Sequence, residues 1–174
     1  MRTSEARSAI PSGFSRDHSR TLLGSGAASF AAARAAFERW AMFDIGWVRV
    51  ANPDAKIALG QLIAVEAHTL GTWTLNLSRI VDVISHEDAF GFVYATTELH
   101  VESGEERFLV ELDPERGEVW YDLQAVSKPH GLPARLGFPV TRHFQHRFAR
   151  ASHAKMLEEV RHVTQARQTD TLKA

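Results

Sequence analysis

The side chains best suited to chemistry lie close together between Tyr94 and Phe108. Tyr94, His100 and Glu106 supply a phenol, an imidazole and a carboxylate, which can pass a proton to or from a bound molecule as general acids or bases. Ser103-Gly104 predicts a tight turn, so the stretch is expected to form a strand, a turn and a second strand. It contains no catalytic triad, zinc motif or phosphate loop. The sequence therefore does not specify a reaction.

Two charged side chains are expected to point into the fold. Alternation along the strands places Arg79 on an apolar face with Trp73 and Leu75, and Glu106 on an apolar face with Phe108. A lone charge on an apolar surface is costly, so we expect Arg79 and Glu106 to pair. A structural ion pair and a polar clamp for a ligand both fit this pattern.

The strand that carries Tyr94 is ambiguous, because either of its faces could be the inner one. If Tyr94 and His100 point inward, they could orient the polar end of a ligand; alternatively, His100 only hydrogen-bonds the following turn. The predicted ligand-binding residues are Arg79, Tyr94, Thr96, His100, Glu106, Tyr121, Ser127, Arg142 and Gln145.

The histidines near the C-terminus do not predict a metal site. His143 and His146 have the i, i+3 spacing of side chains that share a helical face. A protein metal site needs about three converging ligands, and the sequence indicates no third one. We therefore expect neither a metal nor a cofactor.

Composition excludes several classes of protein. The chain has 174 residues, a formal net charge of -1 and no cysteine. No strong positive charge attracts nucleic acid, and disulfides and thiolate sites are impossible. No apolar run reaches the roughly 18 residues of a membrane-spanning helix, and the N-terminus lacks the apolar stretch of a secretory signal. We expect a soluble, cytoplasmic protein, and its composition does not indicate an oligomeric state.

Hydrophobic periodicity predicts a helix, a set of strands and a second helix. Phe30, Ala33, Phe37 and Trp40 recur at helical spacing. Strands are expected at about 59–67, 72–85, 88–101, 105–112 and 117–127, joined by short connections that favour antiparallel neighbours. The segment from about 140 to 165 lacks glycine and proline and is expected to form a long helix.

These elements predict an α+β fold of the helix-grip (START/Bet v 1-like) type. A curved antiparallel sheet covers its apolar face by wrapping around the long C-terminal helix, an arrangement that usually encloses a cavity. We expect residues 1–20 to form a flexible N-terminal arm, 21–166 a single α+β domain and 167–174 a disordered tail.

Many short motifs occur in an order that resembles a known family. They are Leu23-Gly24-Ser25-Gly26, Phe30, Trp40-Ala41-Met42-Phe43, Trp47, Asn76, Arg79, Gly91-Phe92-Val93-Tyr94-Ala95-Thr96, His100, Gly104-Glu105-Glu106-Arg107-Phe108, Ser127-Lys128-Pro129, Arg142 and Gln145. Over about residues 10 to 160 the chain resembles uncharacterised protein family 0548, also called domain of unknown function 1990. Ala95 and Leu99 stand where that family commonly has glycine, and Lys128 where it tends to have arginine. The resemblance implies no established activity.

Three functional hypotheses fit the sequence. The first is a binding module whose cavity holds a small, mostly apolar or amphipathic molecule, with Arg79, Glu106, Tyr94 and His100 at its polar end. The second is an enzyme of the same fold, in which Glu106 or His100 is the general acid or base. The third is a structural or protein-interaction domain with a filled core.

Overall fold

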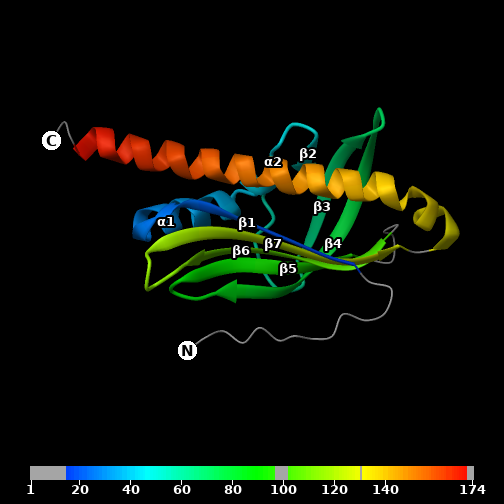
Figure 1. Ribbon diagram of the computed structural model, residues 1–174, viewed down its shortest axis with the longest axis horizontal. Helices are drawn as coiled ribbons and strands as arrows, with labels where there is room; N and C mark the ends of the chain where they lie inside the picture. The colour runs from blue at the N-terminus through cyan, green and yellow to red at the C-terminus, as the bar shows by residue number, and fades with distance from the viewer. Residues whose placement is uncertain (1–14, 97–101, 130, 172–174) are drawn as a thin grey trace.

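The computed structural model describes residues 15–96, 102–129 and 131–171. The elements are β1 (Ser15–Ser25), α1 (Gly26–Glu38), the 3-10 helix η1 (Ala41–Phe43), β2 (Val48–Val50), β3 (Leu62–Thr69), β4 (Thr72–Ser85), β5 (Ala89–Thr96), β6 (Glu102–Leu112), β7 (Glu118–Pro129) and α2 (Gly131–Thr171). The strands form one curved sheet, and α2 runs across its concave face (Figure 1).

The sheet is antiparallel throughout, in the order β1-β7-β6-β5-β4-β3-β2. Consecutive strands from β2 to β7 are neighbours, whereas β1 pairs with β7, the last strand in the chain. Helices α1 and α2 both pack on the concave side (Figure 1). This is the helix-grip architecture predicted from the sequence.

Tight turns set the register of the hairpins. Leu70 and Gly71 join β3 to β4 and both have positive φ, 52° and 78°, as a two-residue hairpin turn of the primed type requires. Between β6 and β7, an Asp113 carboxylate oxygen accepts hydrogen bonds from the backbone N–H groups of Glu115 and Arg116 at 2.9 and 3.1 Å. Such short turns explain why the strands that they join are antiparallel neighbours.

Aromatic rings fill the middle of the concave face. Trp40, between α1 and η1, packs edge-on against Phe92 of β5 at 5.3 Å between ring centroids, and the ring of Phe43 lies 5.2 Å from that of Phe108 of β6. The Phe92 and Phe108 rings stack at 5.1 Å. Phe37, Phe43, Phe92 and Phe108 are at most 1% exposed. Under α1 and η1, the fold therefore has a solid aromatic core.

The N-terminal segment predicted to be a flexible arm contains a strand, β1. Residues 15–20 are part of a strand paired with β7 along its whole length, so the predicted flexibility of this segment is wrong. Both faces of the strand carry polar side chains, which removed the alternation that identifies a half-buried strand. The remainder of the predicted arm, residues 1–14, lies outside the described residues.

The predicted inward orientation of Arg79 is also wrong. Its side chain is exposed and donates a hydrogen bond to the Gly60 carbonyl at 3.1 Å. The neighbours that share its face, Trp73 and Leu75, are 47% and 59% exposed, while Ser78 and Ile80 are buried. The alternation holds from Trp73 to Arg79, but the apolar face of this stretch is the outer one. An irregularity in the β4–β5 pairing after Ile80 then places Val83 opposite the buried Phe92. Arg79 and Glu106 therefore do not pair.

The structure also shows which face of β5 is the inner one and where helix α2 ends. On β5, Phe90 and Phe92 are buried in the core, so the face that they share with Tyr94 is the inner one. Helix α2 is longer than predicted, since it extends to Thr171. The predicted disorder of the tail is therefore wrong for residues 167–171, and residues 172–174 lie outside the described residues.

We predict that Gly91→Ala destabilises the fold. A Cβ on Gly91 would stand 2.1 Å from the Phe108 carbonyl oxygen and 2.9 Å from Leu109 Cα, so β5 and β6 would have to separate. The expected cost is about 3 kcal/mol, a fall of roughly 6–12 °C in the midpoint of thermal unfolding, measured by circular dichroism. An unchanged midpoint would contradict this close approach of the two strands.

Candidate functional site

A row of inner-face residues crosses four neighbouring strands toward one end of the sheet. Tyr94 of β5 pairs in register with Glu106 of β6, Glu106 with Ala125 of β7, and Ala125 with Asp17 of β1. Because paired residues point to the same face, their side chains form one line under α2. The line begins in the aromatic core at Tyr94 and ends at the edge strand.

Tyr94 and Glu106 form the inner contact of this row. The Tyr94 hydroxyl donates a hydrogen bond to Glu106 Oε2, and the Tyr94 ring lies 5.5 Å from that of Phe108. Burial raises the pKa of Tyr94 well above its usual value of 10.0, and the neighbouring Glu106 carboxylate raises it further. Tyr94 is therefore a neutral hydrogen-bond donor at any physiological pH.

Helix α2 covers the other end of the row. Arg142 Nη2 donates to Asp17 Oδ1 at 2.7 Å, and both side chains are mostly buried. One turn further along α2, Gln145, His146 and Phe148 face the sheet beside this ion pair. The Asp17–Arg142 bond therefore joins the edge of the sheet to the helix above it.

A cavity of about 80 Å³ lies between β1, β6, β7 and α2. Its lining residues are Asp17, His18, Ser19, Glu106, Leu123, Ala125, Gln145, His146, Phe148 and Ala149. Apolar groups from β7 and α2 form one part of the wall, and carboxylate, amide and hydroxyl groups form the other. A molecule bound here would have an apolar body and a hydrogen-bonding end.

A second contact between β1 and α2 lies beside the cavity. Ser19 Oγ is 2.8 Å from His153 Nε2, and the His153 ring packs edge-on against that of Tyr121. Burial lowers the pKa of His153 and outweighs the opposite effect of the Asp122 carboxylate. His153 is therefore a neutral imidazole at physiological pH, and either partner of the hydrogen bond can be the donor.

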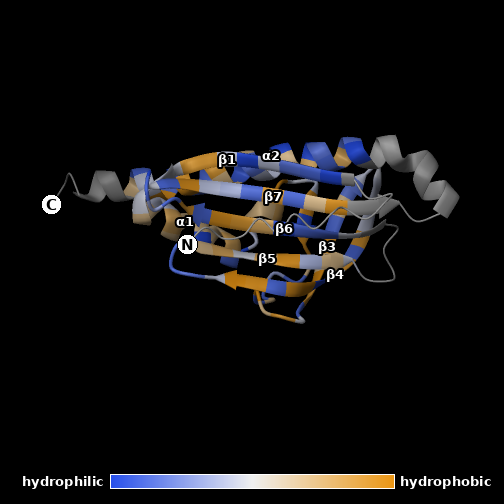
Figure 2. Cartoon of the chain, turned by 60° about the horizontal axis from the view of Figure 1, so that its bottom comes forward, coloured by the Kyte–Doolittle hydropathy of each residue, from blue (hydrophilic) through white to orange (hydrophobic). Residues whose placement is uncertain are grey.

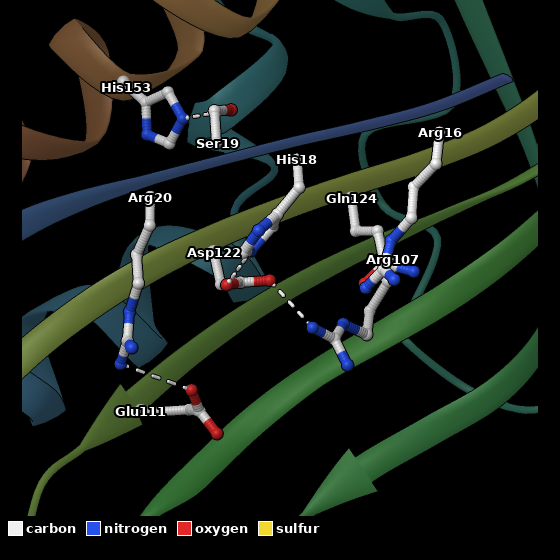
Figure 3. A network of polar contacts seen from close by, with 9 residues as sticks. All are labelled: Arg16, His18, Ser19, Arg20, Arg107, Glu111, Asp122, Gln124 and His153. Atoms are coloured by element: carbon white, nitrogen blue, oxygen red, sulfur yellow. Dashed lines mark hydrogen bonds and ion pairs between the residues drawn. The ribbon is translucent and has the colours of Figure 1, made fainter. Parts of the chain in front are cut away.

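Strand β1 is also held from the outer face of the sheet (Figure 3). Asp122 of β7 is buried there and contacts His18 Nε2 at 2.6 Å and Arg107 Nη2 at 2.8 Å. Nearby, Arg16 donates to Gln124, and Arg20 lies 3.5 Å from Glu111. Along β1, β7 and β6, hydrophilic residues are interspersed with hydrophobic ones (Figure 2). The network of outer-face contacts fixes the strand whose inner side chains, Asp17 and Ser19, line the cavity.

The structure brings together only part of the predicted ligand-binding set. Glu106 and Gln145 line the cavity, Tyr94 contacts Glu106, and Arg142 contacts the lining residue Asp17. These positions are observed, whereas a role in ligand binding remains a prediction for all four.

The other members of the set lie elsewhere. Tyr121 is fully buried beside the cavity, with its hydroxyl 2.8 Å from Ser152 Oγ. The Thr96 hydroxyl contacts the Gly104 backbone between β5 and β6. Arg79 is on the outer face. His100 and the Ser127 side chain lie outside the described residues.

Sequence reasoning missed Asp17 and Ser19, because it assigned both to a flexible arm. The available signal was weak: Asp17, Ser19, Thr21 and Leu23 occupy alternate positions that end in an apolar residue. Recognition of this pattern would have required the β1–β7 pairing, which joins segments from opposite ends of the chain.

The described part of the chain has neither a cluster of metal-binding side chains nor a helix that could span a membrane. No group of three or more histidine, aspartate and glutamate side chains there is arranged to hold a metal ion. Within the same residues, no helix is long and apolar enough to cross a membrane.

Known proteins are similar to this chain in sequence and in fold. A family model described as "Domain of unknown function (DUF1990)" matches residues 1–155. A "UPF0548 protein" from Dictyostelium discoideum is 36% identical over 160 residues, which cover 86% of this chain and 74% of that protein.

Solved structures support the fold. A hypothetical protein from Helicobacter pylori has a TM-score of 0.62 and 12% identity, covering 91% of this chain and 98% of its own. The Zhui aromatase/cyclase from a Streptomyces species has a TM-score of 0.59 and 13% identity, covering 85% and 94%. At such identities these structures show a shared fold and no shared activity.

The two tyrosines of the chain, Tyr94 and Tyr121, should resist ionisation while the protein is folded. Burial raises the pKa of both above 10.0. Their contribution to stability is complete below pH 10.0 and is lost as the pH rises toward the folded-state values, because only the unfolded chain releases these protons. Phenolate absorbance should therefore appear together with unfolding, followed by circular dichroism. Phenolate signal from a folded protein near pH 10 would contradict this burial.

Asp122→Asn should weaken the attachment of β1. We expect a loss of about 2 kcal/mol, less than for a fully buried pair because His18 and Arg107 remain in contact with water. The free energy of unfolding in urea measures it. Glu111→Gln is the matched control, since it breaks the more exposed ion pair with Arg20 and should cost under about 1 kcal/mol. Equal effects of the two substitutions would contradict a special role of Asp122.

Proposed function

We propose that this chain, which belongs to the domain of unknown function 1990 family, binds a small, mostly apolar molecule with one hydrogen-bonding end in the cavity under α2. Tyr94 and Glu106 would lie at the inner side of the polar end, and Asp17, Arg142 and Gln145 at the outer side. The apolar part would contact Leu123, Ala125, Phe148 and Ala149.

The observation that supports this proposal most strongly is that the cavity lies between an apolar wall and a group of polar side chains. Glu106 lies on the inner face of β6 directly beside the aromatic core, yet it borders unfilled space. Ligand pockets typically combine an apolar wall with a few polar groups that orient the bound molecule. A core that served stability alone would close this space with apolar side chains.

The size of the cavity restricts the bound molecule. An apolar cavity of about 150 Å³ in another protein accommodates benzene, so about 80 Å³ holds a narrow group rather than a ring system. A short alkyl chain with a terminal polar group fits this description. Any larger remainder would have to extend outward between β1 and α2.

The charges at the site favour a neutral end group over a carboxylate. Two carboxylates, Asp17 and Glu106, line the cavity, and Arg142 already donates to Asp17. An anionic ligand would meet like charges in a region of low dielectric constant. We therefore expect 1-hexanol to bind more tightly than hexanoate of the same chain length.

A cavity-filling substitution tests the proposal. Ala125→Leu places a larger side chain in the middle of the lining and should weaken 1-hexanol binding at least about tenfold, which corresponds to 1.4 kcal/mol. The measurement is an NMR titration of backbone amides, with the expected shifts at Leu123, Ala125 and Ala149. The matched control is Ala95→Leu, because Ala95 pairs with Arg79 and Glu105 on the outer face.

The outcomes are distinct. Binding that is lost in Ala125→Leu and retained in Ala95→Leu supports the proposal. Absence of any titration with 1-hexanol, or equal affinities in the two variants, would contradict it.

A further inference from the structure

Ser19 and His153 form a hydrogen-bonded pair at the wall of the cavity. Ser19 belongs to β1 and lines the cavity; His153 belongs to α2 and stands behind it at 2.8 Å. A serine that borders open space and contacts a buried histidine has the arrangement of a nucleophile with its general base. Figure 3 shows the two side chains facing each other on the helix side of β1.

The surroundings of His153 suit the role of a base. The Tyr121 ring of β7 and the Ser19 hydroxyl of β1 contact His153 from the inner face of the sheet. The Asp122 carboxylate acts on it electrostatically from the outer face of β7. Burial keeps the imidazole neutral, so that one ring nitrogen can accept a proton. His153 Nδ1 is buried and has no hydrogen-bond partner within the described residues. No acidic side chain therefore fixes the tautomer, which makes the pair a dyad rather than a triad.

We propose that Ser19 is a nucleophile activated by His153, and that the chain hydrolyses small carboxylic esters. The inference rests on the proposed function in one respect, because the acyl part of the ester would lie in the same cavity against Phe148 and Ala149. The Gln145 side-chain amide, which also lines the cavity, is a group of the kind that stabilises an oxyanion.

The chemistry balances with water as the only co-reactant. Ser19 Oγ forms a bond to the ester carbonyl carbon and its proton moves to His153 Nε2. The bond from the carbonyl carbon to the alkoxy oxygen then breaks, and the alcohol leaves with the proton from His153. His153 next removes a proton from water, and the resulting hydroxide attacks the acyl carbon. The bond from that carbon to Ser19 Oγ then breaks as His153 returns the proton to Ser19, which restores the serine hydroxyl and the neutral imidazole. The products are one carboxylic acid and one alcohol.

The first test is covalent labelling with diisopropyl fluorophosphate. We expect one adduct, detected by intact-protein mass spectrometry and located on Ser19 by peptide mapping. Ser19→Ala should lose it. The control Ser85→Ala removes an exposed serine at the end of β4 and should retain it. The absence of an adduct on Ser19 in the wild-type protein overturns the proposal.

The second test separates activation by His153 from a structural contact. The chain has no cysteine, so Ser19→Cys introduces its single thiol. If His153 acts as a base, iodoacetamide at pH 7 should alkylate this thiol severalfold faster than the thiol of Ser19→Cys/His153→Gln, because a thiol pKa about one unit lower raises the thiolate fraction by up to about tenfold. Ser85→Cys gives the rate for an exposed, unactivated thiol. Circular dichroism verifies that each variant is folded.

The two proposals can fail independently. Equal alkylation rates with and without His153, or a thiol that iodoacetamide does not reach, overturn the proposed dyad even if 1-hexanol binds. Conversely, labelling of Ser19 that depends on His153, without any titration by 1-hexanol, supports the dyad and contradicts the proposed binding of small alkyl molecules.

Discussion

Aromatic rings from α1 and η1 fill the middle of the concave face of the sheet, and this packing limits the space in which a small molecule could bind under the helices. Trp40 and Phe43 pack against Phe92 and Phe108 and occupy the space that a curved sheet would otherwise leave under its covering helix. Close packing of this kind leaves few voids larger than a water molecule. The cavity is therefore restricted to the side where β1 and α2 meet beyond Tyr94.

The edge strand β1 is the element that closes the cavity, and three successive residues hold it in place. Asp17 bonds Arg142 of α2, His18 bonds Asp122 of β7, and Ser19 bonds His153 of α2. Because side chains alternate along a strand, the bonds of Asp17 and Ser19 reach α2 on the inner face, whereas the bond of His18 reaches β7 on the outer face. An edge strand with few apolar contacts depends on such polar bonds, so the same residues position the site and stabilise its wall.

Much of the fold could be predicted from the sequence, whereas the site could be predicted only in part. The long helix and the strands from β3 to β7 have clear periodicity and turn residues such as Gly71 and Asp113. Strand β1 has polar side chains on both faces, so its role depends on pairing with β7 at the far end of the chain. On β4, alternation correctly grouped Arg79 with Trp73, but only the three-dimensional curvature of the sheet decides that they face outward, and the shift in pairing with β5 after Ile80 has no signal in the sequence. Glu106 was placed inward correctly, and its partner is Tyr94 rather than Arg79.

The measurement that tests this account most directly is the location of xenon in crystals of the protein under gas pressure. Xenon enters apolar cavities that are open to it and does not enter close-packed cores. We expect one xenon atom between Leu123, Phe148 and Ala149, and none between the rings of Phe43, Phe92 and Phe108. Xenon within the aromatic cluster, or its absence from the space under α2, would contradict the account.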